Sequence, residues 1–237
     1  MTSSPIPYYD QDGITIYHGD CREILPLLDP VDLVLTDPPY TERTHKSVRS
    51  NSSKATKGNR VITFSSVTTE ELRQIYASLG AVTKGWVVST MDYATAFEFE
   101  QSPPDGLRMM RIGVWVKTNP MPQISADRPG QGWEAIAYLH RSDKASSWNG
   151  GGRSGNFILP VEQGMGHPTA KPISMFRELV DRFSDPGAIV LDPFMGSGTS
   201  LRAAKDMGRR AIGIDIDERH CETAMKRLRQ SVLPLGV

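Results

Sequence analysis

The sequence has few cysteines, no excess charge of either sign and no long apolar run, and each shortage excludes a class of protein. Its 237 residues include two cysteines, Cys21 and Cys221, too few for a disulfide framework or a cysteine-rich zinc site. Lysine plus arginine and aspartate plus glutamate each total 27, so no whole-molecule field points to a charged partner. No apolar run approaches the ~20 residues of a membrane span, and the polar N-terminus lacks a signal-like segment. These absences predict a cytoplasmic protein with no membrane contact.

The residues that are present favour one folded domain over 1–237. Hydrophobic residues make up 38% and charged residues 23%, enough for a sizeable core. Short β-rich runs at 13–17, 31–36, 86–89, 112–116, 188–191 and 211–214 alternate with helical patterns, and Ala135 to Leu139 is expected to pair with 112–116. The alternation predicts an α/β fold with a doubly wound, Rossmann-like, mostly parallel sheet covered by helices on both faces.

Two segments interrupt the alternation and are interpreted as loop insertions. Residues 118–166 are rich in proline and glycine and contain Trp148 and Arg153, whose side chains are either base-reading groups or loop filler. Residues 41–60 contain one acid, Glu42, among six basic residues. These are Arg43, Lys46, Arg49, Lys54, Lys57 and Arg60. The basic segment is either a solvated loop or a phosphate-contacting one.

A glycine turn follows the apolar strand at 188–191. It runs Asp192-Pro193-Phe194-Met195-Gly196-Ser197-Gly198-Thr199 and opens a helical pattern. Such a turn lets a ligand approach the backbone, but no lysine follows the second glycine as it does in a phosphate-binding P-loop. Asp215 ends the next strand, where an acid accepts hydrogen bonds from ribose hydroxyls, whereas Asp217 is expected to cap the last helix. Turn and acid together favour a nucleoside cofactor over a purely structural turn.

The tetrapeptide Asp37-Pro38-Pro39-Tyr40 follows the strand at 31–36. Its two prolines remove two N–H donors and fix the backbone, leaving the Asp37 carboxylate and the Pro38 carbonyl as acceptors. Two acceptors beside an aromatic ring suit an amino group on a flat heterocycle. The alternative is an Asp-Pro turn that merely ends the strand.

The order of these motifs resembles the β-class of S-adenosylmethionine-dependent DNA amino-methyltransferases, which modify adenine N6 or cytosine N4. In that circularly permuted arrangement the tetrapeptide comes first and the glycine turn lies near the C-terminus. The segment from His167 to Pro172 resembles the family's stretch before the cofactor strand, and Ile16 to Cys21 resembles its N-terminal cofactor strand. Weaker similarities are 115–119 and Glu134.

The resemblance implies a role for each motif. Asp37, Pro38, Pro39 and Tyr40 are the implied catalytic residues. At the adenine of the cofactor it implies Asp20, Cys21 through its backbone, and Phe194 against the ring. It implies Asp215 at the ribose, and Asp192 with Gly196, Ser197, Gly198 and Thr199 at the methionine portion. The residues implied to close the pocket are His167, Thr169 and Lys171. The methyl donor is an activated sulfonium, so no metal is needed.

The chemistry requires the target base to leave the DNA stack, and stacking on Tyr40 would offset part of the cost. An aspartate opening the tetrapeptide favours adenine N6, with cytosine N4 as the main alternative. Two other hypotheses are methylation of an amide or amine in RNA or protein, and a catalytically silent nucleic-acid-binding module. Double-stranded DNA is the expected partner, and a homodimer and a companion restriction endonuclease are open expectations.

Overall fold

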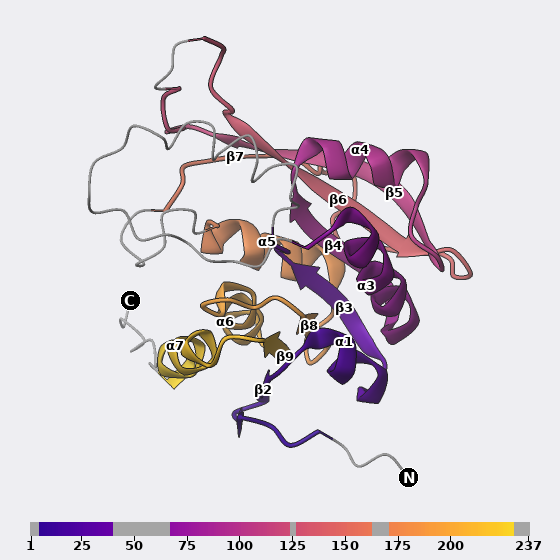
Figure 1. Ribbon diagram of the computed structural model, residues 1–237, viewed down its shortest axis with the longest axis vertical. Helices are drawn as coiled ribbons and strands as arrows, with labels where there is room; N and C mark the ends of the chain where they lie inside the picture. The colour runs from indigo at the N-terminus through magenta and orange to yellow at the C-terminus, as the bar shows by residue number, and fades with distance from the viewer. Residues whose placement is uncertain (1–4, 40–66, 124–126, 163–170, 230–237) are drawn as a thin grey trace.

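The computed structural model describes residues 5–39, 67–123, 127–162 and 171–229, which form one mixed sheet with helices on both faces (Figure 1). The sheet has nine strands in the order β1-β2-β9-β8-β3-β4-β6-β5-β7. Their bounds are β1 Tyr9–Gln11, β2 Ile14–His18, β3 Val31–Thr36, β4 Thr83–Met91, β5 Leu107–Lys117, β6 Trp133–Arg141, β7 Phe157–Leu159, β8 Ile189–Asp192 and β9 Arg210–Asp215.

Five neighbouring strands, β2, β9, β8, β3 and β4, run parallel to one another. Beyond them, β6 pairs antiparallel with both β4 and β5. The predicted fold class is therefore confirmed. The predicted pairing of the 135–139 run is confirmed as well, because Ala135 lies opposite Val114 and Ala137 opposite Ile112.

Helices α1 (Cys21–Ile24), α3 (Thr69–Val82) and α4 (Tyr93–Gln101) pack on one face of the sheet, with a short 3₁₀ turn at Leu25–Leu27. Helices α5 (Ile173–Phe183), α6 (Thr199–Asp206) and α7 (Glu218–Arg229) pack on the other (Figure 1). Thr68 and Glu71 form a reciprocal capping box that fixes the start of α3.

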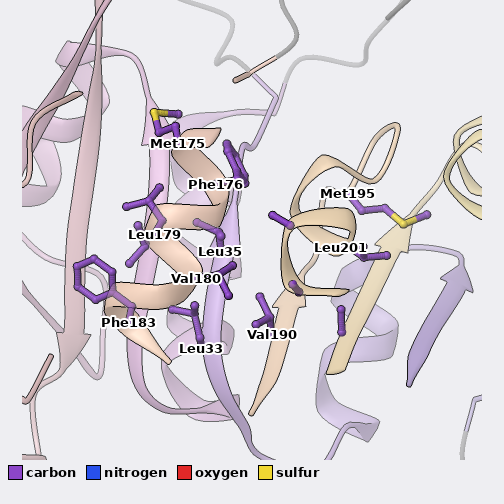
Figure 2. Close-up of a cluster of buried hydrophobic side chains, with 14 of the residues drawn as sticks. Leu33, Leu35, Met175, Phe176, Leu179, Val180, Phe183, Val190, Met195 and Leu201 are labelled. Carbon is purple, nitrogen blue, oxygen red and sulfur yellow. The ribbon is translucent and has the colours of Figure 1, made fainter. Parts of the chain in front are cut away.

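The core lies on both sides of the parallel strands because such strands are covered on both faces. Leu33 and Leu35 of β3 point toward α5, while Val34 points to the opposite cluster. Figure 2 shows Leu33, Leu35 and Val190 beside the apolar side of α5, which carries Phe176, Leu179 and Val180. This packing fixes the ends of β3 and β8 relative to each other.

The segment 118–166, interpreted as a loop insertion, contains two strands. Residues 133–141 are β6, whose central side chains Ile136 and Leu139 are fully buried, and 157–159 are the edge strand β7. Most of the proline and glycine lies in the connections before and after β6, so the composition of the whole segment does not indicate this strand. Among the described residues no helix has the length and apolar character to cross a bilayer.

Candidate active site

The carboxyl ends of four neighbouring strands bring the predicted site residues together. Asp20 follows β2, Asp215 ends β9, Asp192 ends β8 and Asp37 follows β3. These strands are adjacent and parallel, so the four aspartates lie along one edge of the sheet. In doubly wound sheets ligands bind at this edge.

Asp37 has hydrogen-bond partners on both carboxylate oxygens. Thr90 donates its hydroxyl to Oδ1 at 2.5 Å, and the Lys171 ammonium donates to Oδ2 at 2.7 Å. The side chain nevertheless remains 35% exposed, so the carboxylate is fixed and still accessible. Thr90 was not predicted from the sequence. It lies beside Asp37 because Thr36 of β3 pairs with Ser89 of β4, which places the next residues of the two strands side by side.

Lys171 makes contacts that its motif did not imply. The resemblance puts it beside the methionine portion of the cofactor, whereas the structure puts its ammonium between Asp37 and Glu134, whose Oε2 lies 3.1 Å away. Its place near the cofactor is untested by these contacts, but its contact with Asp37 was unforeseen.

Asp192 is buried, with 3% of its surface exposed, and its partners all come from the protein. Oδ1 accepts hydrogen bonds from the Thr36 hydroxyl at 2.7 Å and from the Phe194 N–H at 3.0 Å, and the Ser200 hydroxyl donates to Oδ2. Burial raises the pKa of the Asp192 carboxyl to about 6, because these hydrogen bonds offset only part of the desolvation. The side chain thus joins β3, β8 and the first turn of α6.

The glycine turn after β8 has the backbone that only glycine adopts easily. Gly196 has φ 50° and Gly198 has φ 79°, both left-handed. A β-carbon on Gly198 would lie 2.9 Å from Cβ of Ala224, whereas one on Gly196 would meet nothing within 4 Å. The turn is therefore packed tightly against α7 at Gly198 and open at Gly196. An open glycine backbone beside a helix N-terminus fits the methionine end of S-adenosylmethionine.

Asp215 holds the loops around it in place. Its Oδ2 accepts from the Gly196 N–H at 2.9 Å, and its Oδ1 accepts from the Asp217 N–H at 2.9 Å. His220 Nδ1 lies 3.1 Å from Oδ1, and this hydrogen bond raises the pKa of His220. Asp217 accepts the Arg219 N–H at the start of α7, as predicted for a cap. Next to Asp215, Ile216 is 69% exposed.

Asp20 and Cys21 lie where α1 begins. Asp20 caps that helix by accepting the Arg22 N–H at 2.9 Å and is held by the Arg22 guanidinium, which lowers the pKa of Asp20. Cys21 is buried, and burial raises the pKa of its thiol to about 12. A buried, protonated thiol agrees with a residue that meets a ligand only through its backbone.

Of the two predicted base-reading residues in the described chain, Trp148 lies at the opposite edge of the sheet from Asp37. Its ring packs on Phe183 at 5.5 Å, where α5 ends, and the neighbouring Ser147 carbonyl accepts from Trp86 near the start of β4. These contacts account for Trp148 as a packing residue, so we leave it out of the DNA-contacting surface proposed below. Arg153 is exposed, and its contact with DNA stays a prediction.

Several predicted site residues lie outside the described residues, and their placement is left to the sequence. They are Tyr40 of the tetrapeptide, the basic residues Arg43, Lys46, Arg49, Lys54, Lys57 and Arg60, and His167 and Thr169 of the segment before Lys171.

Comparisons with known proteins identify the family. The family described as DNA methylase, of the N6 and N4 type, matches residues 31–226. The Type II methyltransferase M2.DpnII of Streptococcus pneumoniae is 26% identical over 94% of this chain and 92% of its own length. M.HinfI of Haemophilus influenzae is 27% identical over 91% of this chain and 68% of its own length.

Solved structures show the same fold. The M1.HpyAVI–SAM complex superposes with a TM-score of 0.72 at 25% identity, covering 92% of this chain and all of that one. The cytosine-N4-specific PvuII DNA methyltransferase gives 0.72 at 14% identity over 97% of this chain and 91% of its own, a likeness of fold alone. The family match spans most of the chain and includes Asp37, Asp192 and Asp215. The chain therefore belongs to the N6/N4 DNA methylase family, and it is an S-adenosylmethionine-dependent DNA methyltransferase.

Proposed function

We propose that this enzyme methylates the N6 amine of an adenine flipped out of double-stranded DNA, with Asp37 as the residue that orients the amine. The observation that carries this proposal is the Asp37 carboxylate, held at both oxygens by Thr90 and Lys171 and still 35% exposed. It lies next to the glycine turn, because β3 and β8 are neighbours in the sheet.

The weak point of the reaction is the nucleophile, since the lone pair of an aromatic amine is delocalised into its ring. S-adenosylmethionine supplies a methyl group on a positively charged sulfur that is already activated. A carboxylate has about four lone-pair sites, so each oxygen of Asp37 keeps room for an amine proton beside its protein partner. Hydrogen bonds from the amine to Asp37 and to the Pro38 carbonyl would aim the nitrogen lone pair and stabilise the charge that develops on nitrogen.

The cofactor is assigned to the adjoining strand ends. The open backbone of Gly196 and the turn through Thr199 would hold its methionine portion, with Asp192 acting through the turn it anchors. Asp215 would bind the ribose, and Asp20, Cys21 and Phe194 would lie around the adenine, where the exposed Ile216 adds apolar surface. His167 and Thr169 join this set on the strength of their motif.

The DNA-contacting surface is assigned to Tyr40, to the basic residues of 41–60 and to Arg153. Tyr40 would stack on the extruded base, and stacking of this kind is worth about 1–3 kcal/mol per base, comparable to the cost of extrusion. The six basic residues come within 20 positions after Tyr40 in the sequence, and on that ground they are assigned to phosphates near the target base.

Cytosine N4 is the second candidate target, because the matching family includes methylases of the N4 type. The aspartate that opens the tetrapeptide favours adenine. We also propose a cytoplasmic location, a homodimer, and a companion restriction endonuclease, the last because the curated relatives are Type II methyltransferases. Light scattering of the purified protein tests the dimer.

The experiment that tests the target is mass spectrometry of nucleosides from unmethylated DNA incubated with the enzyme and S-adenosylmethionine. We expect N6-methyladenine with the wild type and none with Asp37→Ala. Asp29→Ala is the matched control, because Asp29 also precedes a proline but is exposed at the other end of β3. N4-methylcytosine instead would move the target to cytosine. No methylated base in any DNA would overturn the proposal.

A further inference from the structure

A lysine is buried between two carboxylates at the edge of the catalytic site. Lys171, just before α5, has 4% of its side chain exposed. Its ammonium lies 2.7 Å from Asp37 Oδ2 and 3.1 Å from Glu134 Oε2. A buried ammonium is costly unless it is paired, so this placement requires both acids nearby.

The charges continue beyond Lys171 in an alternating row. Glu134 at the start of β6 places Oε1 2.6 Å from the ammonium of Lys117, which ends β5. Lys117 in turn lies 5.1 Å from the centre of the Trp115 ring. Burial alone would raise the pKa of Glu134, but Lys171 and Lys117 together hold it below its usual value. Glu134 is therefore an ionised anchor that holds Lys171 against Asp37.

We propose that Lys171 is a positioning residue for Asp37 and serves the substrate side of the site rather than the cofactor. The inference rests on the proposed role of Asp37. Thr90 holds one oxygen of Asp37 from β4 and Lys171 holds the other from the segment before α5, so both hydrogen bonds oppose rotation of the carboxylate plane. Glu134 holds the far side of the Lys171 ammonium. The orientation of Asp37 is thus set by three segments distant in sequence.

Rotating the carboxylate would misdirect the amine. A misplacement of about 1 Å at a reacting group can cost on the order of 100-fold in rate. By contrast, a lysine that binds the carboxylate of the cofactor would, when removed, weaken cofactor binding first. Removing a positioning lysine should therefore lower kcat and leave cofactor affinity nearly unchanged, whereas removing a cofactor-binding lysine should lower the affinity.

The test compares Lys171→Met with Lys84→Met. In the wild type the Lys84 ammonium pairs with Asp32 at 2.7 Å, near the amino ends of β3 and β4. For the full-length Lys171→Met protein we expect kcat to fall by about 100-fold while the dissociation constant for S-adenosylmethionine, from calorimetry, changes less than threefold. Lys84→Met should leave both values near those of the wild type. A tenfold or greater loss of cofactor affinity in Lys171→Met would overturn the proposal.

A second variant separates positioning from stability. Lys171→Met combined with Glu134→Gln restores charge balance, because Asp37 and Lys117 then remain as one acid and one base. We expect the double variant to recover unfolding stability but not turnover, and recovery of turnover would contradict the positioning role. If the wild type itself methylates no DNA, the proposed function fails. The role of Lys171 is then tested by the cofactor titration and by a double-mutant cycle of unfolding free energy with Asp37→Ala. Zero coupling energy between Lys171 and Asp37 in that cycle would overturn the positioning role.

Discussion

Strands β3 and β8 lie side by side, and an Asp-Pro pair stands near each end of both strands, yet the four aspartates have different surroundings. At the amino ends, Asp29 is exposed, and Asp185 accepts a hydrogen bond from the Asn149 side chain beside the end of α5. At the carboxyl ends, Asp37 pairs with a buried lysine and Asp192 with two hydroxyls and a backbone N–H. The aspartate of the same dipeptide thus has a different exposure or a different set of partners at each of the four positions.

The two carboxyl-end aspartates show what decides between them. Asp192 has only uncharged partners and is sealed from solvent, so its burial raises the pKa to about 6. Asp37 has an ammonium partner and remains a third exposed. A carboxylate that is fixed, charge-paired and accessible is suited to act on a substrate. A buried one with every oxygen satisfied holds strands and loops together.

The largest expected effect is the loss of turnover in Asp37→Ala. Removing an acceptor aimed at charge developing in the transition state costs on the order of 10³-fold in kcat. Single-turnover methyl transfer to unmethylated DNA measures it, with Asp29→Ala unchanged as control. A fall of less than tenfold in Asp37→Ala would remove Asp37 from the chemistry.

Asp192→Ala is expected to lower stability, because it leaves the Phe194 N–H and two buried hydroxyls without their acceptor. The cost is about 1–3 kcal/mol in the free energy of unfolding, measured by urea denaturation. Asp185→Ala, at the amino end of the same strand, should cost less than half as much. Equal losses in the two variants would erase the distinction between the two ends of β8.

Asp192 also predicts a pH dependence of stability. Its folded-state pKa of about 6 lies above the ordinary 3.8, so its stabilising contribution is complete below pH about 4 and is lost as the pH rises through 6. The unfolding free energy of the wild type relative to Asp192→Asn should therefore decrease between pH 4 and pH 7, by up to about 3 kcal/mol. A difference that is flat or that increases with pH would contradict the burial argument.

The basic segment is expected to affect DNA affinity through salt. Each phosphate contact contributes about −0.9 to the slope of log affinity against log salt, so reversing Lys54, Lys57 and Arg60 to Glu should flatten the slope by about 2–3. Lys144 is exposed beyond the carboxyl end of β6, far from Asp37 along the strands, and Lys144→Glu should leave the slope unchanged. An unaltered slope in the triple variant would show that 41–60 does not contact DNA.

The smallest effect is expected at α3, away from the site. Thr68→Ala removes the side chain that accepts from the Glu71 N–H at 3.1 Å and should cost about 1 kcal/mol of unfolding free energy. Turnover at a temperature where the variant is folded should match the wild type. A change in kcat would mean that α3 contributes to the site more directly than its contacts indicate.

Local sequence predicted the strands whose apolar runs are continuous. The run at 188–191 and the pattern of Ile173, Phe176, Val180 and Phe183 identify β8 and α5 because burial requires those side chains. The same reasoning missed β1 and β7, which have three residues each, and placed β6 inside an insertion. Short edge strands depend on a neighbour for their hydrogen bonds and so leave little trace in composition.

The candidate site was predictable as a set of motifs and not as a set of contacts. Asp37, the glycine turn and Asp215 are each marked by their neighbours in the chain. Thr90 has no such mark, and the contact of Lys171 with Asp37 spans 134 positions. Such contacts depend on strand order and register, which a single sequence does not reveal.

We infer that Asp37 acts on the substrate while the neighbouring end of β8 serves the cofactor. The most direct test is a calorimetric titration of Asp37→Ala with S-adenosylmethionine, set beside its turnover on DNA. We expect a dissociation constant within about threefold of the wild type and a rate lower by about 10³-fold. A loss of cofactor affinity as large as the loss of rate would contradict it.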